Sequence, residues 1–177
     1  MSDRIAAFDI GFATTGAVIM AKDPSGTHWY MQKSYFIKTE ADKSKKALRK
    51  ADQDVARVAE SARKIKAIIE THSIRRMVVE IPHGGGKSSR AVRCMALATA
   101  KIATIAELLE LAVEWYSPDD TRKAATGSRV ASKQSVVDAM GSKHPQVFGY
   151  STQEAREAVA DAAATFEAAR NGVLVRL

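Results

Sequence analysis

The chain has 177 residues, of which 46% are hydrophobic and 27% are charged. This length suits one domain with a substantial core, and the composition is typical of a soluble globular protein. No apolar run approaches the roughly 20 residues that cross a bilayer, and the first residues do not resemble a signal peptide. We therefore expect an intracellular protein, in the cytoplasm or nucleoid, with no membrane partner. The single cysteine, Cys94, excludes an internal disulfide and a zinc site built on cysteines.

The chain is basic, with a net charge of +7 and an isoelectric point near 9.6. This balance favours a polyanionic partner such as a nucleic acid. Charge alone does not identify a ligand, because many basic proteins bind nothing acidic. It becomes informative when the same chain also places acidic residues in apolar surroundings.

The first part of the chain predicts three antiparallel strands in meander order. Two short strands cover Ile5 to Met20 around a turn at Gly11 to Thr15, and a third covers Trp29 to Thr39. The segment Asp23 to Gly26 has the composition of a turn, because proline presets φ and glycine accepts a positive φ.

Helices and two further strands follow. Apolar residues three and four apart predict the helices, and short β-rich runs predict the strands. The expected elements are a helix at Ala51–Thr71, a strand at Arg75–Ile81, a helix at Arg90–Leu111, a strand at Val113–Tyr116, short helices at Asp119–Ala125 and Ala131–Met140, and a last helix at Thr152–Arg170 closed by Asn171-Gly172. Without an internal repeat or a low-complexity linker, the pattern predicts one α/β domain over residues 1–177.

The helix expected from Arg90 to Leu111 is apolar on two faces. Its two stripes are Met95, Ala98, Ile102, Ile105 and Leu109, and Leu97, Ala100, Thr104, Leu108 and Leu111. A helix that is apolar on two sides has to be covered on two sides. We expect it to be either buried within the domain or shared with a second subunit.

Three carboxylates interrupt apolar segments. Asp9 lies within the first strand, Glu80 ends the fourth, and Asp161 lies among the alanines of the last helix. Charged groups rarely occupy such places unless they are paired or bind a metal, because their desolvation is costly. Any one of them could face water by chance. Together they suggest a magnesium site, since magnesium is held by a few carboxylates with water and substrate phosphate.

The order and spacing of these acids resemble the motifs of RuvC-type resolvases, which are nucleases of the ribonuclease H-like superfamily. The likeness extends from Ile5 to about Arg170 and involves four motifs in order. The similar segments are Phe8-Asp9-Ile10-Gly11 with Thr15-Gly16, then Val78-Val79-Glu80, then the basic stretch from Pro118 to Val136, and finally Asp161-Ala162-Ala163-Ala164.

This resemblance implies a ribonuclease H-like fold, with a five-stranded mixed sheet flanked by helices. It implies that Asp9, Glu80 and Asp161 are catalytic and bind two magnesium ions, which manganese can replace. It also implies a homodimer that resolves four-way (Holliday) DNA junctions by symmetric phosphodiester hydrolysis.

The last helix departs from the family pattern, in which a second acid or a histidine stands three residues from the first. Ala158 occupies that position here. Glu157, four residues before Asp161 and on nearly the same helical face, is our candidate for a fourth ligand or a metal-adjacent base. Glu154, one turn further back, is the second candidate. Some relatives also have an aromatic wedge soon after the second acid, where this chain has Pro82-His83 and three glycines.

Basic residues near the motifs are the candidate DNA contacts. They are Lys87, Arg90, Arg93, Arg122, Lys123, Arg129 and Lys133. We expect them to bind phosphates near the cut, although the first three could simply be the solvated start of a helix. The resemblance gives Lys133 a catalytic or phosphate-clamping role. The run from Lys43 to Lys50 is more typical of solvated surface.

Three other functions are compatible with parts of the sequence. The pattern D-x-G-x-x-x-T-G from Asp9 to Gly16 also resembles the phosphate loop of actin-like ATPases and sugar kinases, but those enzymes need two such domains and the chain is too short. A related nuclease acting on another branched DNA or on an RNA:DNA hybrid is not separated by charge or motifs. A non-catalytic junction-binding relative is disfavoured because the acids are retained.

Overall fold

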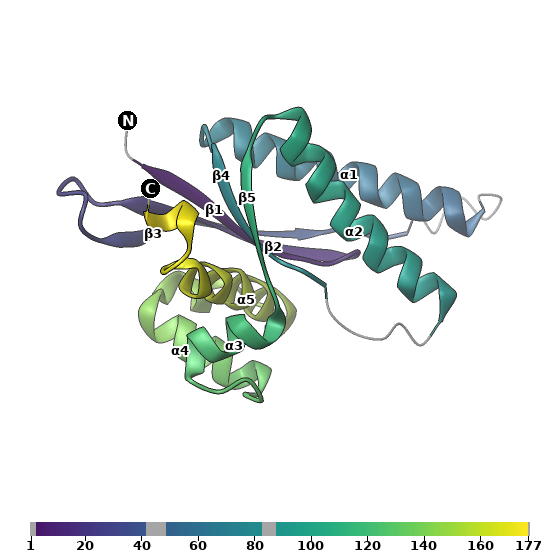
Figure 1. The fold of residues 1–177 in the computed structure, drawn as a ribbon. Helices are drawn as coiled ribbons and strands as arrows, with labels where there is room; N and C mark the ends of the chain where they lie inside the picture. The colour runs from purple at the N-terminus through teal and green to yellow at the C-terminus, as the bar shows by residue number, and fades with distance from the viewer. Residues whose placement is uncertain (1–2, 42–48, 83–87, 177) are drawn as a thin grey trace.

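Five strands form one mixed sheet in the computed structural model, which describes residues 3–41, 49–82 and 88–176 (Figure 1). They are β1 (Arg4–Ile10), β2 (Thr14–Lys22), β3 (Trp29–Lys38), β4 (Arg76–Glu80) and β5 (Ala112–Tyr116). Their order across the sheet is β3-β2-β1-β4-β5. The first three strands are antiparallel neighbours, whereas β4 pairs parallel with β1 and with β5. The predicted meander with parallel additions is confirmed.

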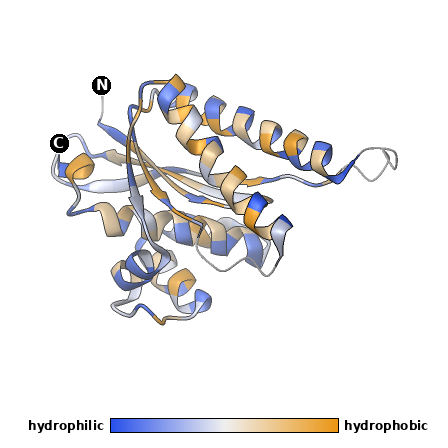
Figure 2. Cartoon of the chain, turned by 45° about the vertical axis from the view of Figure 1, so that its right-hand side comes forward, coloured by the Kyte–Doolittle hydropathy of each residue, from blue (hydrophilic) through white to orange (hydrophobic). Residues whose placement is uncertain are grey.

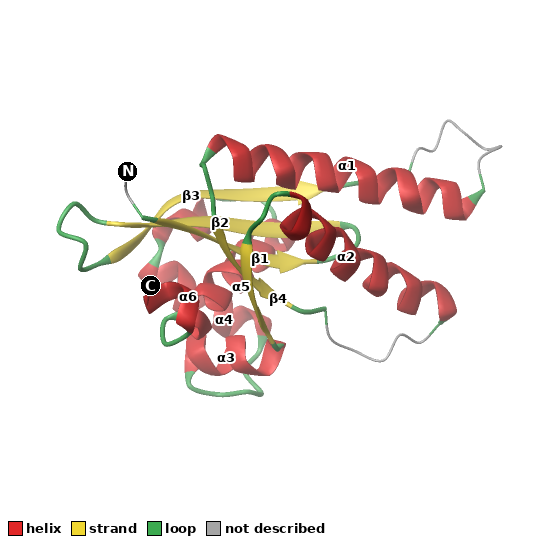
Figure 3. Ribbon diagram, turned by 45° about the horizontal axis from the view of Figure 1, so that its top comes forward, coloured by secondary structure: helices red, strands yellow, loops and turns green. Residues whose placement is uncertain are grey.

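Helices cover both faces of the sheet (Figures 1 and 3). On one face lie α1 (Lys50–Thr71) and α2 (Ser89–Leu108), and on the other lie α3 (Pro118–Thr126), α4 (Lys133–Lys143) and α5 (Gln153–Ala169). A short 3-10 helix (Pro145–Gly149) and α6 (Val173–Arg176) complete the described elements. None of the described helices is both long and apolar enough to cross a membrane. The expected α/β fold class is confirmed.

The alternation of side chains along the strands divides the core into two layers. In β1, Ile5 and Ala7 belong to the layer under α5, whereas Ala6, Phe8 and Ile10 belong to the layer under α1 and α2. Because successive residues of a strand point to opposite faces, each strand contributes to both layers. This two-sided burial explains why the strands are apolar almost throughout.

Side-chain caps determine where four of the described helices begin. Ser88, Ser117, Ser132 and Thr152 each accept a hydrogen bond from the backbone N–H three residues further on. Since Ser132 is the cap, α4 begins at Lys133, two residues later than predicted.

The end of the last long helix differs from the prediction. α5 ends at Ala169, and the expected cap at Asn171-Gly172 instead leads into α6. A Cβ on Gly172 would lie 2.3 Å from a carboxylate oxygen of Glu114 and 2.5 Å from the hydroxyl of Tyr116. The glycine therefore permits a close approach to β5, which the local sequence did not reveal.

Only one of the two apolar stripes on α2 is covered in the single chain. Ala98, Ile102 and Ile105 are at most 8% exposed and pack toward the sheet. The second stripe lies along a groove between α1 and α2, where Leu108 is 76% exposed. Figure 2 shows the hydrophobic residues along these helices in orange. The helix is thus buried on one side and apolar but open on the other.

Candidate active site

The sheet brings Asp9 and Glu80 together. β1 and β4 are parallel neighbours, and their register pairs Asp9 with Glu80. Two residues earlier on each strand, Ala7 and Val78 lie in the core layer under α5. The two-residue period of a strand places both carboxylates on that same face. The acids therefore lie side by side at the carboxyl ends of their strands.

The last long helix reaches these acids because small residues let it pack closely. Gly16 lies opposite Asp9 in the register of β1 with β2. A Cβ on Gly16 would lie 1.9 Å from the carbonyl oxygen of Ala158 on α5, so any other residue would push the helix away. Asp161, one turn further along α5, then comes within electrostatic reach of Asp9. The glycine of the first motif thus has a packing role beside the site.

The three acids are half-buried, and this burial disfavours their negative charge. Burial, and then the charges of Asp161 and Glu80, raise the pKa of Asp9 well above its usual range. Burial raises the pKa of Glu80 to about 7, although a hydrogen bond from Thr121 opposes the change. Burial also raises the pKa of Asp161 to about 6, against the lowering effect of Lys133. A bound cation would relieve this repulsion.

The donor chemistry of the three acids fits magnesium, which prefers carboxylate oxygens. Within the described residues, no three acidic, histidine or cysteine side chains already form a cluster that could hold a metal ion. Asp9, Glu80 and Asp161 therefore lie within electrostatic reach of one another without sharing a coordination sphere. Because burial disfavours the charged form of each acid, a bound cation would stabilise the three carboxylates.

Thr121 contacts the site and was not predicted from the sequence. It is 2% exposed, and its hydroxyl donates a 2.5 Å hydrogen bond to Oε2 of Glu80. The same hydroxyl lies 3.0 Å from the carbonyl oxygen of Pro118. Thr121 therefore restricts the orientation of the Glu80 side chain. The sequence gives only a weak signal for this role. Thr121 and Ala125 are four residues apart, and together they form the buried face of α3.

Glu157 binds Lys133 at the edge of the site. Oε2 of Glu157 lies 3.3 Å from Nζ of Lys133, and Gln153 donates to the other carboxylate oxygen at 3.1 Å. Burial alone would lower the pKa of Lys133, but the acidic residues around it raise it. The second candidate, Glu154, instead pairs with Lys38 at 2.8 Å. Of the two candidates, Glu157 is the one beside the acids.

The predicted DNA contacts of the third motif lie near the acids or on the adjoining surface. The charge of Arg122 lowers the pKa values of both Glu80 and Asp161, which places its guanidinium close to them. Lys123 and Arg129 are exposed on α3 and on the segment that follows it. The chain thus surrounds an acidic centre with cations, as expected for a site that binds phosphate beside metal ions.

The other predicted DNA contacts are Lys87, Arg90 and Arg93. The two that the structure describes, Arg90 and Arg93, lie on the other face of the sheet, at the start of α2. Arg90 and Arg93 both bind Asp54 of α1. Lys87 lies outside the described residues, as do residues 43–48 of the basic run Lys43–Lys50.

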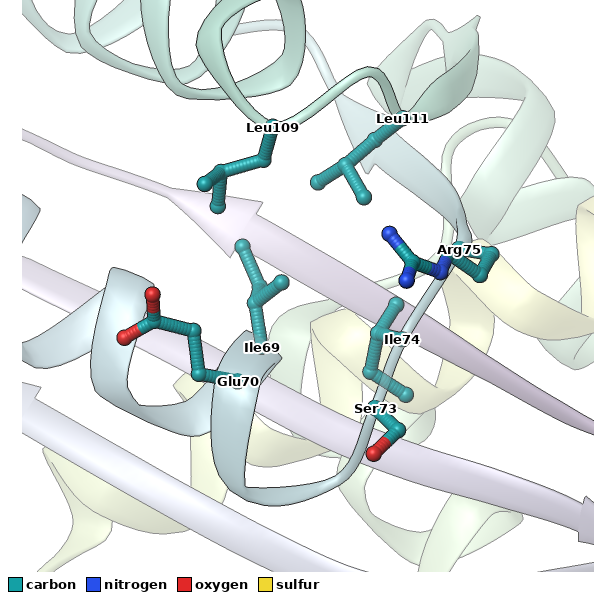
Figure 4. Close-up of a pocket in the computed structure, with 7 residues that line it drawn as sticks. All are labelled: Ile69, Glu70, Ser73, Ile74, Arg75, Leu109 and Leu111. Atoms are coloured by element: carbon teal, nitrogen blue, oxygen red, sulfur yellow. The ribbon is translucent and has the colours of Figure 1, made fainter.

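A hollow of about 300 Å³ lies beside the N-terminal end of β4, whereas Glu80 is at the C-terminal end of this strand (Figure 4). It is lined by Ile69, Glu70, Ser73, Ile74, Arg75, Leu109 and Leu111. Its one acidic residue, Glu70, forms an ion pair with Lys66. None of the candidate site residues contributes to it, so the hollow is separate from the acidic centre.

Solved structures share this fold. Thermus thermophilus RuvC, in complex with a Holliday junction substrate, matches with a TM-score of 0.71 and 17% identity over 96% of each chain. The chain has the ribonuclease H-like fold of RuvC. The yeast mitochondrial Holliday junction resolvase Ydc2 has a TM-score of 0.64 at 11% identity, over 98% of this chain and 80% of its own. Fowlpox virus resolvase with substrate Holliday junction DNA gives 0.51 at 12%, over 93% and 97%.

No protein-family model and no curated protein matches the sequence. At the identities found, the likeness to these structures establishes the fold. The chemistry of the site has to be argued from this chain's own residues.

Proposed function

We propose that the protein is a metal-dependent endonuclease that resolves four-way DNA junctions. The observation that carries this proposal is the convergence of Asp9, Glu80 and Asp161, with raised pKa values, beside the cations Lys133 and Arg122. The RuvC fold supports it, because the similar proteins are Holliday junction resolvases. The net charge of +7 supports a polyanionic substrate.

The proposed reaction is the hydrolysis of a DNA phosphodiester, in which water adds to phosphorus, one P–O ester bond breaks, and the departing oxygen takes up a proton. Asp9, Glu80 and Asp161 would hold magnesium, or manganese in its place. When bound, two such ions would supply an activated water and would stabilise the leaving oxygen. Lys133 and Arg122 would neutralise charge on the phosphate, and Glu157 would hold Lys133 in place.

We further infer that two copies act together, which would permit symmetric cutting of two strands. The groove between α1 and α2 has a volume of about 420 Å³ and is mostly apolar. Its apolar lining includes Val58, Ala62, Leu97, Ala100 and Leu108. The open stripe of α2 from a second copy would cover it, because a two-fold contact places the same patch on both subunits. Light scattering on the wild type and on Leu108→Glu tests this: a dimer that becomes a monomer is expected.

The deciding experiment compares cleavage of a synthetic four-way junction, a duplex and an RNA:DNA hybrid, with magnesium, by the wild type and Asp9→Asn. Paired symmetric nicks in the junction, absent with the variant, are expected. Cleavage of the hybrid instead would keep the chemistry and change the substrate. Tight junction binding without any cleavage would overturn the catalytic assignment and favour a junction-binding protein.

A further inference from the structure

One buried carboxylate holds two arginines at the start of α2. Asp54, in the first turns of α1, is 1% exposed. Arg90 binds both of its oxygens, through Nη2 at 2.7 Å and Nε at 3.2 Å. Arg93, about one helical turn further on, donates from Nη2 at 2.9 Å. The hydrogen bonds from Arg90 and then Arg93 hold the pKa of Asp54 below its usual range, despite its burial.

The arginines remain available to a ligand. Their side chains are 54% and 49% exposed, whereas that of Asp54 is 2% exposed. A guanidinium has five N–H donors in a rigid plane, and Arg90 uses only two of them on Asp54. The acid therefore fixes the inner edge of each guanidinium and leaves other donors on the outer side.

The charges in this cluster do not balance. One carboxylate compensates one guanidinium, so two arginines on Asp54 leave a net positive charge at the protein surface. A contact that only tied α1 to α2 would need a single arginine. Two planar cations held at a fixed spacing suit an anion with several oxygens, such as successive phosphates of a nucleic-acid backbone.

We propose that Asp54 is a positioning residue that presents Arg90 and Arg93 as a two-point grip on the phosphate backbone of a junction arm. This inference rests on the proposed function. The start of α2 follows β4, which ends in Glu80, and the N-terminal ends of α1 and α2 lie at the same side of the molecule (Figure 3). The grip lies on the opposite face of the sheet from α3 and α5. It would therefore bind a part of the DNA that is distant from the phosphodiester that is cut.

The test measures binding of a four-way junction and of a duplex, without divalent ions, as a function of salt concentration. The variants are Asp54→Asn and the control Asp3→Asn. Asp3 also pairs with an arginine, Arg76, but at the opposite ends of β1 and β4. Both changes remove one negative charge from a carboxylate that pairs with two cations, which are Arg90 and Arg93 for Asp54, and Arg76 and Lys22 for Asp3. Only Asp54→Asn should disturb the grip.

We expect Asp54→Asn to weaken junction binding about 5- to 10-fold relative to Asp3→Asn, in line with the loss of charge-assisted hydrogen bonds that order the arginines. The slope of log affinity against log salt should fall by about 2 when Arg90 and Arg93 are both changed to Gln, because each change removes one cation that neutralises a phosphate. Arg90→Lys keeps the charge but loses the fork, and it should resemble Asp54→Asn.

Equal salt slopes for the wild type and the variant with both Arg90→Gln and Arg93→Gln would overturn the inference, as would identical binding by Asp54→Asn and Asp3→Asn. If Asp54→Asn proves unfolded, the arginine variants still decide the question. If the wild type cuts junctions and these variants bind junctions normally, the proposed role of Asp54, Arg90 and Arg93 is wrong, whereas the proposed function stands. A wild type that neither binds nor cuts junctions would instead remove the proposed function.

Discussion

Asp54 and Asp9 both lie in crowded surroundings, and their neighbours differ in sign. Asp54 is surrounded by the guanidinium groups of Arg90 and Arg93, which hold its pKa low. Asp9 lies beside Asp161 and Glu80, and burial, followed by the charges of these two acids, raises its pKa. When cations hold the pKa of an acid low, the folded state favours its charged form. An acid crowded by other acids is unfavourable unless a further cation arrives, which is the property expected of a metal ligand.

The largest effect is expected when Asp161, an acid of the acidic centre, is replaced with Asn. This variant tests whether such an acid serves catalysis and not stability. Loss of a metal ligand should lower junction cleavage by more than about 100-fold, beyond the 10–100-fold typical of a residue that only supports a ligand. The fold should survive, because the amide removes a negative charge that burial disfavours. Single-turnover cleavage and thermal unfolding measure the two effects. A large fall in Tm, as expected for an acid that stabilises the fold, would contradict the distinction.

A smaller loss is expected for Thr121→Val, which keeps the shape of the side chain and removes the hydroxyl that binds Glu80. Cleavage should fall by about 10-fold, because the carboxylate loses its fixed orientation. Thr121→Ser keeps the hydroxyl and should restore most of the rate. The magnesium concentration for half-maximal cleavage should rise in the valine variant alone. If serine and valine behave alike, the role of Thr121 is packing.

The pH dependence of stability distinguishes the two kinds of acid. Glu80 has a folded pKa of about 7 against an ordinary value of 4.5, so the folded state binds the proton more tightly than the unfolded state between these values. Its contribution to stability is therefore greatest below about pH 4.5 and is lost as the pH rises through 7. In urea unfolding without metal, the free energy of unfolding of the wild type should decrease as the pH rises from about 4.5 to 7. Glu80→Gln should make this decrease smaller, by on the order of 2 kcal/mol.

Asp54 has the opposite sign. Its folded pKa is lowered, so its contribution is present above the ordinary value of 3.8 and is lost as the pH falls through the folded value. Asp54→Asn should therefore remove stability at neutral pH and leave the neutral-range fall due to Glu80 unchanged. A loss of that fall in Asp54→Asn would show that the two acids are not independent.

The smallest effect is expected for Glu157→Gln, which tests whether this acid is a fourth metal ligand. The structure gives it Lys133 as a partner at 3.3 Å, on a partly exposed edge. Such a pair contributes up to about 1 kcal/mol, so cleavage should fall only about 3-fold. A loss beyond about 100-fold would place Glu157 among the metal ligands. Glu154→Gln, which breaks the pair with Lys38, is the matched control.

The sequence alone determined the elements and three central acids. The meander, the parallel strands and the helices follow from local periodicity, which each segment carries in its own side chains. Asp9, Glu80 and Asp161 were identifiable because each interrupts an apolar segment, and because their order resembles a known family. Their roles as ligands stay predictions, whereas the fold is confirmed.

Only the tertiary structure decided which groups meet across those elements. The hydroxyl of Thr121 reaches Glu80 over 41 residues, and Arg90 reaches Asp54 over 36. The helical period left Glu157 and Glu154 as alternatives. The structure gives them different partners, since Glu157 pairs with Lys133 beside the acids and Glu154 pairs with Lys38. The reason is physical: periodicity determines which face a side chain occupies, while the packing of α5 on Gly16 and of α1 on α2 determines its partner. Those contacts between distant segments are not encoded in any local pattern.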